Sequence, residues 1–250
     1  MELKDILGVD DELNLYLVAN GLKPAAMLTI DPRNPRLEPF VEKSERKILW
    51  VRNSKIRLKE GIIENIKELL DKTGINYEGF LEENTSRTYK NFCCLPVRVA
   101  RERSLQYQIS AGRDRKSLDR LLEAQTSEER GIVLGYPKEA IEAYKKVIDG
   151  ERRDGSYIPV SLAKAKQAGL ELPTWLAYIC FVPENLDLVN GNVSESSKAL
   201  AEKYQNFVRE NNPELAERVE KHFFERKLPD GWEKRPDGGY AYFFKPHAKD

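Results

Sequence analysis

Arginine is concentrated in one short part of the chain, between Arg98 and Arg120. Seven basic residues stand there beside three acidic ones, although the whole chain balances 41 basic against 41 acidic residues. The planar guanidinium group forms paired hydrogen bonds to phosphate and carboxylate oxygens. The expected chemistry is therefore anion binding, and the candidate ligand-binding residues are Arg98, Arg101, Arg103, Arg113 and Arg115.

Gly112 belongs to the same candidate site. It ends the short connection Ser110–Gly112 between a predicted strand, Leu105–Ser110, and a predicted helix with Ser117 as its N-cap. The free N–H groups at the start of a helix favour an anion. The sequence thus predicts non-covalent binding of a phosphate-bearing ligand, a nucleotide or RNA. The alternative is a solvated charged surface whose arginines form intramolecular ion pairs.

Other chemistries have weaker support in the sequence. The chain has two histidines and three cysteines, and it lacks CxxC, HxxxH, GxGxxG and GxxxxGK[ST] patterns. We therefore predict no metal and no cofactor. Cys93 and Cys94 would point to opposite faces of a strand, which is typical of small buried side chains rather than of paired ligands.

A mixture of strands and helices must position these residues. Strands are expected at Lys47–Arg52, at Phe92–Val99, at Leu105–Ser110 and, buried on both faces, at Trp175–Val182. Apolar spacing predicts helices at 1–20, 58–70, 137–148, 161–168, 194–210 and 213–226, and capping-box spacing of Thr126 and Glu129 predicts a short one. The segment Leu22–Pro39 contains four prolines and is expected to be irregular.

These elements predict an α+β or α/β fold, a mixed sheet flanked by helices. Gly150–Gly155 is the best candidate linker, and it divides an N-terminal α/β lobe, 1–150, from a C-terminal helical lobe, 151–250, unless the two form one continuous domain. Trp232–Lys245 has turn residues between aromatic arms, which predicts a C-terminal aromatic β-hairpin.

Composition limits the cellular context. No apolar run approaches the length of a membrane span, and the N-terminus lacks the pattern of a signal peptide, so we expect a cytoplasmic protein with no membrane partner. Charged residues make up 33% of the chain, with few glutamines. Such a composition favours a thermophilic source.

Two regions resemble a known family. Gly131–Tyr144 (GIVLGYPKEAIEAY), together with Ile179–Pro183 (ICFVP), Ser194–Tyr204 and Asn212–Ala216 (NPELA), is similar to an uncharacterised, mainly archaeal family, domain of unknown function 483. The resemblance spans about residues 85 to 225 and implies a shared fold. It implies no activity, because Glu139, Ala140, Glu184 and Ser194 stand where the family has cysteines.

The same resemblance suggests a second site vicinity, made of Tyr136, Glu139, Glu184 and Ser194. If these positions converge, Glu139 and Glu184 are candidates for carboxylate-based enzyme chemistry. A further alternative is a structural or partner-binding protein whose C-terminal Tyr and Trp residues form a homo-oligomer or hetero-complex interface. The sequence leaves open whether the protein is an enzyme.

Overall fold

The computed structural model describes residues 2–48, 51–92, 95–148, 175–179, 195–227, 231–234 and 240–243. The chain divides into two compact units, Met1–Leu122 (unit 1) and Glu123–Asp250 (unit 2). This division falls before the predicted boundary at 150 and 151. The predicted linker Gly150–Gly155 and the predicted helix 161–168 lie outside the described residues.

Unit 1 is built on a mixed five-stranded sheet, as expected from the sequence. Its strands are β1 (Ala25–Ile30), β2 (Val41–Ile48), β3 (Val51–Leu58), β4 (Asn76–Phe92) and β5 (Leu95–Gly112). β5 pairs along its whole length with β4, and on its other side with β3 and then β1. The β3–β5 pair is parallel, and all other pairs in this sheet are antiparallel.

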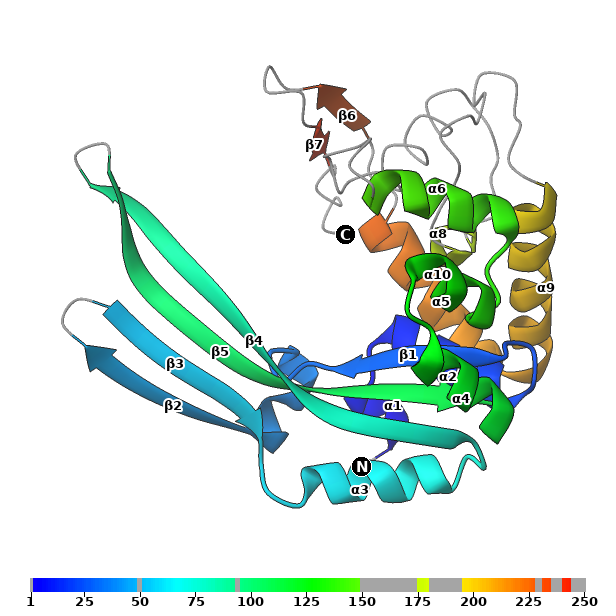
Figure 1. Cartoon of the computed structure of the whole chain (residues 1–250), viewed down its shortest axis with the longest axis horizontal. Helices are drawn as coiled ribbons and strands as arrows, with labels where there is room; N and C mark the ends of the chain where they lie inside the picture. The colour runs from blue at the N-terminus through cyan, green and yellow to red at the C-terminus, as the bar shows by residue number, and fades with distance from the viewer. Residues whose placement is uncertain are drawn as a thin grey trace, which may run out of the picture. The chain divides into compact units, whose positions relative to one another are not determined.

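The sheet has an inner and an outer half. β1 pairs with β5 from Tyr107 to Gly112, whereas β3 pairs with β5 from Ala100 to Ser104. We call β2, β3 and the parts of β4 and β5 between Asn84 and Ser104 the outer half. Figure 1 shows the β2–β3 and β4–β5 hairpins extending in the same direction, away from β1 and α3.

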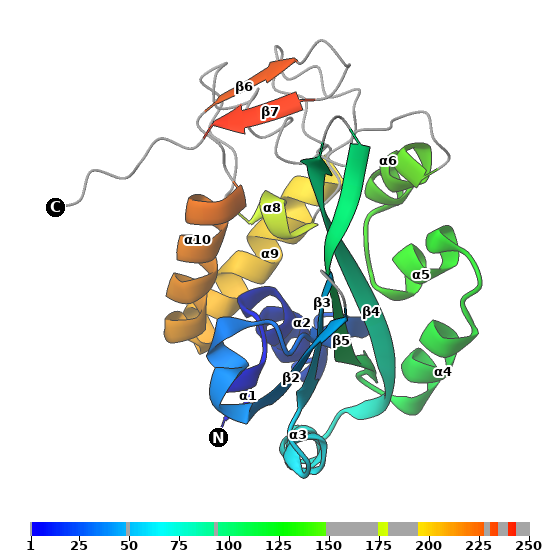
Figure 2. The same ribbon diagram turned by 90° about the vertical axis from the view of Figure 1, so that its left-hand side faces the viewer.

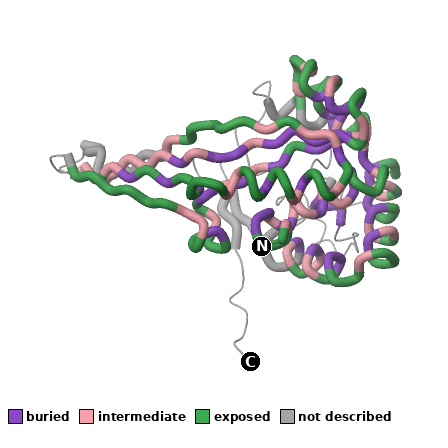
Figure 3. The backbone as a smooth tube through the Cα atoms, turned by 90° about the horizontal axis from the view of Figure 1, so that it is seen from below, coloured by how far each residue is buried: buried purple, intermediate pink, exposed green. Residues whose placement is uncertain are grey.

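Helices of unit 1 cover the inner half. They are α1 (Leu3–Ile6), α2 (Val9–Ala19), the 3-10 helix η1 (Pro35–Phe40), α3 (Ile62–Asp71) and α4 (Arg115–Glu123). Alternate residues of β1 and β5, among them Leu28, Ile30 and Ile109, are buried with Ile66 and Leu70 of α3. Buried backbone is therefore concentrated around this core, whereas exposed and intermediate residues follow the hairpins (Figure 3).

Four expectations for unit 1 are wrong. Lys47–Arg52 is not one buried strand, because β2 ends at Ile48 and the antiparallel β3 begins at Val51, its partner. Phe92–Val99 is likewise divided between β4 and β5, with Phe92 opposite Leu95. β1 lies within the segment that was expected to be irregular. Ser117 lies inside α4, and the Asp114 carboxylate accepts the hydrogen bond from the Ser117 backbone N–H at 2.7 Å.

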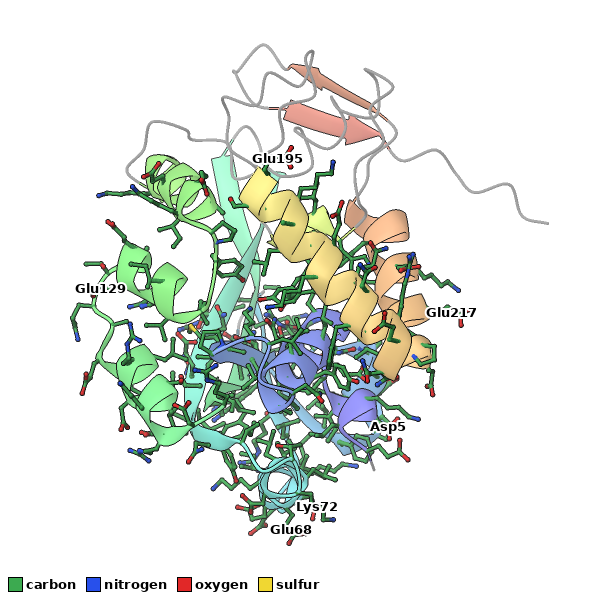
Figure 4. All side chains as sticks on the ribbon, turned by 90° about the vertical axis from the view of Figure 1, so that its right-hand side faces the viewer. Asp5, Glu68, Lys72, Glu129, Glu195 and Glu217 are labelled. Carbon is green, nitrogen blue, oxygen red and sulfur yellow. The ribbon has the colours of Figure 1, made fainter. Side chains whose placement is uncertain are left out.

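Unit 2 contains helices and a small antiparallel sheet. The helices are α5 (Ser127–Val133), α6 (Lys138–Ile148), α8 (Leu176–Ile179), α9 (Glu195–Asn211) and α10 (Pro213–Lys227). The expected capping box is present: Glu129 N–H donates to Thr126 Oγ1 at 3.1 Å, and Thr126 N–H donates to the Glu129 carboxylate at 3.0 Å. Glu129 lies in the first turn of α5 (Figure 4).

α8 replaces the strand expected at Trp175–Val182, whose residues from Cys180 onward lie outside the described part. Trp175 and Phe223 are fully buried and make an edge-to-face contact, with ring centroids 6.2 Å apart. Tyr178 makes an edge-to-face contact with Tyr204 of α9 and a stacked contact with Phe223 of α10. The described part of this apolar run is therefore a short helix in an aromatic core. Its composition is typical of a strand, but packing against the aromatic residues of α9 and α10 favours the helix.

The C-terminal hairpin expected from the sequence is confirmed. β6 (Gly231–Lys234) and β7 (Tyr240–Phe243) pair antiparallel, with Trp232 opposite Tyr242. Figure 2 shows these two strands side by side.

Candidate nucleic-acid interface

The structure divides the predicted arginine cluster into two groups. Arg101 and Arg103 lie in the middle of β5, whereas Arg113 and Arg115 follow its end. Ten residues of extended strand separate Arg103 from Arg113, which corresponds to about 33 Å. A single small ligand therefore does not reach both groups along this strand.

The group at the end of β5 is neutralised by neighbouring acids. Arg113 lies 3.1 Å from the Asp114 carboxylate, and Arg115 lies 2.8 Å from that of Asp119. The Ser117 backbone N–H and then the Arg113 side chain hold the pKa of Asp114 below its usual value. This end of β5 corresponds to the alternative reading of the sequence, an exposed surface with local ion pairs.

Gly112 has a structural role in this connection. A Cβ atom there would lie 2.5 Å from the backbone nitrogen of Leu118 and 2.9 Å from the carbonyl oxygen of Asp114. Glycine thus allows the first turn of α4 to approach the last residue of β5. The tight turn expected here is present, and helix packing accounts for its glycine.

Arg98, Arg101 and Arg103 share one face of the sheet because β5 contains a bulge. Thr88 pairs with Ala100 and the next residue, Tyr89, pairs with Arg98, so Val99 has no partner in β4. Residues directly opposite in an antiparallel pair lie on the same face. Without the bulge, Arg98 would lie on the face opposite Arg101, because strand residues alternate between faces.

Four further basic residues occupy the same face at their register positions. Pairing places Arg87 opposite Arg101, Lys55 beside Arg103, and Arg46 opposite Asn53, itself beside Arg101. We call this surface of the outer half the basic face, and its basic residues are Arg46, Lys55, Arg57, Arg87, Arg98, Arg101 and Arg103. Glu42 is the one acidic residue at a register position on this face within the outer half, the strand segments described above.

Acidic partners on the basic face are too few to neutralise it. Glu42 pairs with Arg57 at 2.8 Å, and Glu83, the residue before the outer half begins in β4, lies 3.7 Å from Arg103. Arg46, Lys55 and Arg101 form no ion pair or hydrogen bond with the side chains that the structure describes, and the buried Nε of Arg101 has no acceptor among them. Positive charge therefore accumulates across neighbouring strands.

The opposite face of β5 has a different chemistry. The Gln106 side chain accepts from Asn84 at 3.2 Å and donates to Asp31 at 2.7 Å, and Gln108 accepts from Thr29 at 2.8 Å. Burial alone would raise the pKa of Asp31, but hydrogen bonds from Arg33 and Gln106 outweigh it and lower that pKa. These amides satisfy one another, so around Gln106 and Gln108 this face offers a connected polar network.

The second predicted vicinity is described in part. Tyr136 follows Gly135, whose φ is 77°, and donates its backbone N–H to Gly131 at 3.1 Å. Glu139, at the start of α6, accepts a hydrogen bond from Ser196 of α9 at 2.8 Å. Glu184 and Ser194 lie outside the described residues. The structure thus brings the beginnings of α6 and α9 together, and an enzyme based on Glu139 and Glu184 stays a prediction.

Sequence reasoning found the β5 arginines but missed their neighbours on β2, β3 and β4. A signal was available in the alternating charged segments 42–47 and 52–57, although only the strand register shows which residues share a face. In the described ranges, no three His, Cys, Asp or Glu side chains are grouped to hold a metal ion. No described helix has both the length and the apolar character needed to span a bilayer.

Comparison with known proteins adds no class assignment. No family model, no curated protein and no solved structure matches this chain. The resemblance noted for residues 85 to 225 therefore stays a prediction, and the functional argument rests on the residues themselves.

Proposed function

We propose that this protein binds the phosphate backbone of a nucleic acid, such as the RNA expected from the sequence, through the basic face. The observation that carries the proposal is the surplus of cations on adjacent strands. The basic face has seven basic residues and one acidic residue within the outer half, in a chain of zero formal net charge. Surface charges in folded proteins usually alternate in sign, and a one-signed patch attracts a polyanion.

The breadth of the basic face favours a polymer over a single nucleotide. Its residues extend across four hydrogen-bonded strands, β2, β3, β5 and β4. Four strands place the outer two about 14 Å apart, and alternate residues along one strand are separated by about 7 Å. Cations at these separations match several successive phosphates, whereas a nucleotide presents adjoining phosphates to one concave pocket.

Some neighbouring residues on the basic face carry like charges and repel each other. Lys55 lies beside Arg103, and Arg87 lies directly opposite Arg101. Like charges at such positions destabilise a sheet, by up to about 1 kcal/mol for each pair. A bound phosphate between two such cations removes their repulsion, so ligand binding and sheet stability are coupled.

Binding in this arrangement needs no covalent step. The guanidinium and ammonium groups donate charge-assisted hydrogen bonds to phosphate oxygens, and the ligand releases its condensed counterions. Backbone recognition of this kind positions the polymer without reading bases. We therefore expect affinity to depend strongly on salt and weakly on sequence.

The experiment is fluorescence anisotropy with labelled RNA and DNA oligonucleotides of the same sequence, single-stranded and duplex, at several salt concentrations. We compare the wild type with the double variant Lys55→Ala and Arg101→Ala. The matched control is Arg113→Ala with Arg115→Ala, which removes the same charge from the other end of β5.

The proposal predicts that the first variant flattens the plot of log affinity against log salt by about two charges, while the control retains the wild-type slope. Affinity that is independent of salt would contradict the proposal. Equal losses in the two double variants would also contradict it, because they would indicate attraction by net charge alone.

A further inference from the structure

β4 is an edge strand of unusual length. It pairs with β5 from Asn76 to Phe92 and with no other described strand. The five residues from Phe80 to Asn84 are exposed, including two large apolar side chains, Phe80 at 54% and Leu81 at 53%. A long edge with apolar residues is a template for pairing with another strand.

Two of the usual protections against edge pairing, proline and lysine, are absent from most of β4. The segment Asn76–Tyr89 contains no proline and no lysine. The bulge in this hairpin lies in β5, at Val99, so the residues of β4 continue in uninterrupted register past Thr88. The outer edge of β4 is therefore regular, and a partner strand can follow it over most of its length.

We propose that β4 pairs antiparallel with β4 of a second copy of this chain, with Thr85 opposite Thr85 at the two-fold axis. This register places Glu83 opposite Arg87 of the second copy, twice by symmetry. It also places Leu81 opposite Tyr89 of the second copy. Opposite charges and apolar–aromatic neighbours are the pairs that stabilise antiparallel strands.

Most neighbouring registers are less favourable. An axis at Glu82, Glu83 or Arg87 brings identical charges directly opposite each other, and an axis at Asn84 places the exposed Leu81 opposite Arg87. An axis at Ser86 places Glu82 opposite Lys90, but it leaves Glu83 opposite Tyr89 and Arg87 opposite Thr85, so the charges nearest the axis stay unpaired. The charge pattern of β4 is thus self-complementary about Thr85. Self-complementarity about a two-fold axis is the requirement for an isologous dimer, which identifies the partner as a second copy rather than an unrelated strand.

The dimer extends one sheet across both copies. A two-fold axis perpendicular to that sheet leaves each face on its own side, so both basic faces lie on the same surface. Each Arg87 would then gain the Glu83 carboxylate of the second copy beside Arg101. This inference does not rest on nucleic-acid binding, because strand pairing and charge matching alone support it.

The test is a charge exchange on the full chain, followed by sedimentation equilibrium. Wild type is expected to be a dimer at micromolar concentration. Glu83→Arg and Arg87→Glu should each weaken the dimer at least about tenfold, since each places like charges opposite each other. The combined variant should restore it. Circular dichroism melting of each variant identifies any loss of folding.

A second measurement tests the register directly and remains valid if a charge variant fails to fold. In a background with Cys93, Cys94 and Cys180 changed to serine, Thr85→Cys should form an intermolecular disulfide on mild oxidation. Phe80→Cys, which lies opposite Lys90 of the second copy, should not. A monomeric wild type, a combined variant that does not recover, or equal cross-linking at both positions would overturn the proposal.

Discussion

Lys55 and Arg103 occupy neighbouring positions in the parallel ladder between β3 and β5, on one face of the sheet. Glu83 lies 3.7 Å from Arg103, and Lys55 has no ionic partner among the described side chains. Two cations thus lie side by side where an ion pair would be more stable. This arrangement opposes folding and favours a bound anion.

Replacing Lys55 with glutamate should therefore separate stability from binding. Lys55→Glu places a carboxylate beside Arg103 and should raise the free energy of unfolding by about 0.5 kcal/mol, measured as a higher urea midpoint at low salt. The same variant should bind RNA more weakly. Lys116→Glu, with the same change in net charge on α4, should retain binding, and a destabilised Lys55→Glu would contradict the argument.

Gly112 should affect stability rather than ligand binding. Gly112→Ala adds a Cβ within 2.5 Å of a backbone nitrogen of α4, and displacing backbone to relieve such overlap should cost about 1–3 kcal/mol. Thermal unfolding measures the loss. Nucleic-acid affinity of the folded variant should equal that of the wild type. A loss of affinity without a loss of stability would indicate that Gly112 contributes to the binding site.

Asp11 should make the stability of unit 1 depend on pH. Burial, opposed by a hydrogen bond from the Thr29 N–H and assisted by Asp10, raises the pKa of Asp11 from 3.8 to about 6. The unfolded chain ionises more readily, so the contribution of Asp11 is complete below its unfolded pKa and is lost as the pH rises through about 6. The full loss should be about 3 kcal/mol.

Asp11→Asn isolates this effect, because the amide oxygen still accepts from Thr29 but does not titrate. Urea midpoints are measured between about pH 4 and pH 7. The difference in stability between wild type and variant should shift in favour of the variant over this range. A difference that is constant with pH would exclude Asp11 as its source.

Glu220 should be the polar centre of the aromatic core in unit 2. Its Oε1 accepts from Arg209 Nε at 2.8 Å, from Trp175 Nε1 at 3.2 Å and from Gln205 Nε2 at 3.3 Å. Burial alone would raise its pKa, but these three donors lower it. Glu220→Ala leaves the indole N–H of a fully buried tryptophan without an acceptor.

The expected loss for Glu220→Ala is about 2–4 kcal/mol, read from urea unfolding followed by tryptophan fluorescence. Glu217→Ala on the same helix is the matched control, because Glu217 is exposed and points outward from α10 (Figure 4). It should change stability by less than about 0.5 kcal/mol. Equal effects of the two variants would exclude a special role for the Glu220 hydrogen bonds.

Helices were more predictable than strands in this sequence. Apolar residues at helical spacing predicted α3, α9 and α10, and Thr126 with Glu129 predicted the start of α5, because both signals are local. The hairpins were missed because the apolar runs around Ile48 and Phe92 extend through the point where the strands reverse, without the Asn, Asp or Gly that marks most turns. Pairing partners in a sheet are distant in sequence, and the composition of one strand does not identify them.

The same limit applies to the candidate interface. The arginines of β5 were evident as a local excess of charge. Only the strand register shows that Lys55 and Arg46 share a face with these arginines. Arg113 and Arg115 lie far from them, because an extended strand separates residues that a helix would keep close. Composition predicted that the site binds anions, whereas strand pairing determines which residues form it.

Because of the bulge at Val99, the face of the sheet on which Arg98 lies depends on the number of residues in β5. Deleting this residue would preserve every arginine and yet transfer Arg98 to the side of the sheet that carries the glutamine network. Two chains of nearly identical composition that differ by this one codon would thus present different numbers of cations to the same ligand. An insertion or deletion in this hairpin can therefore redirect binding during evolution as effectively as a charge substitution.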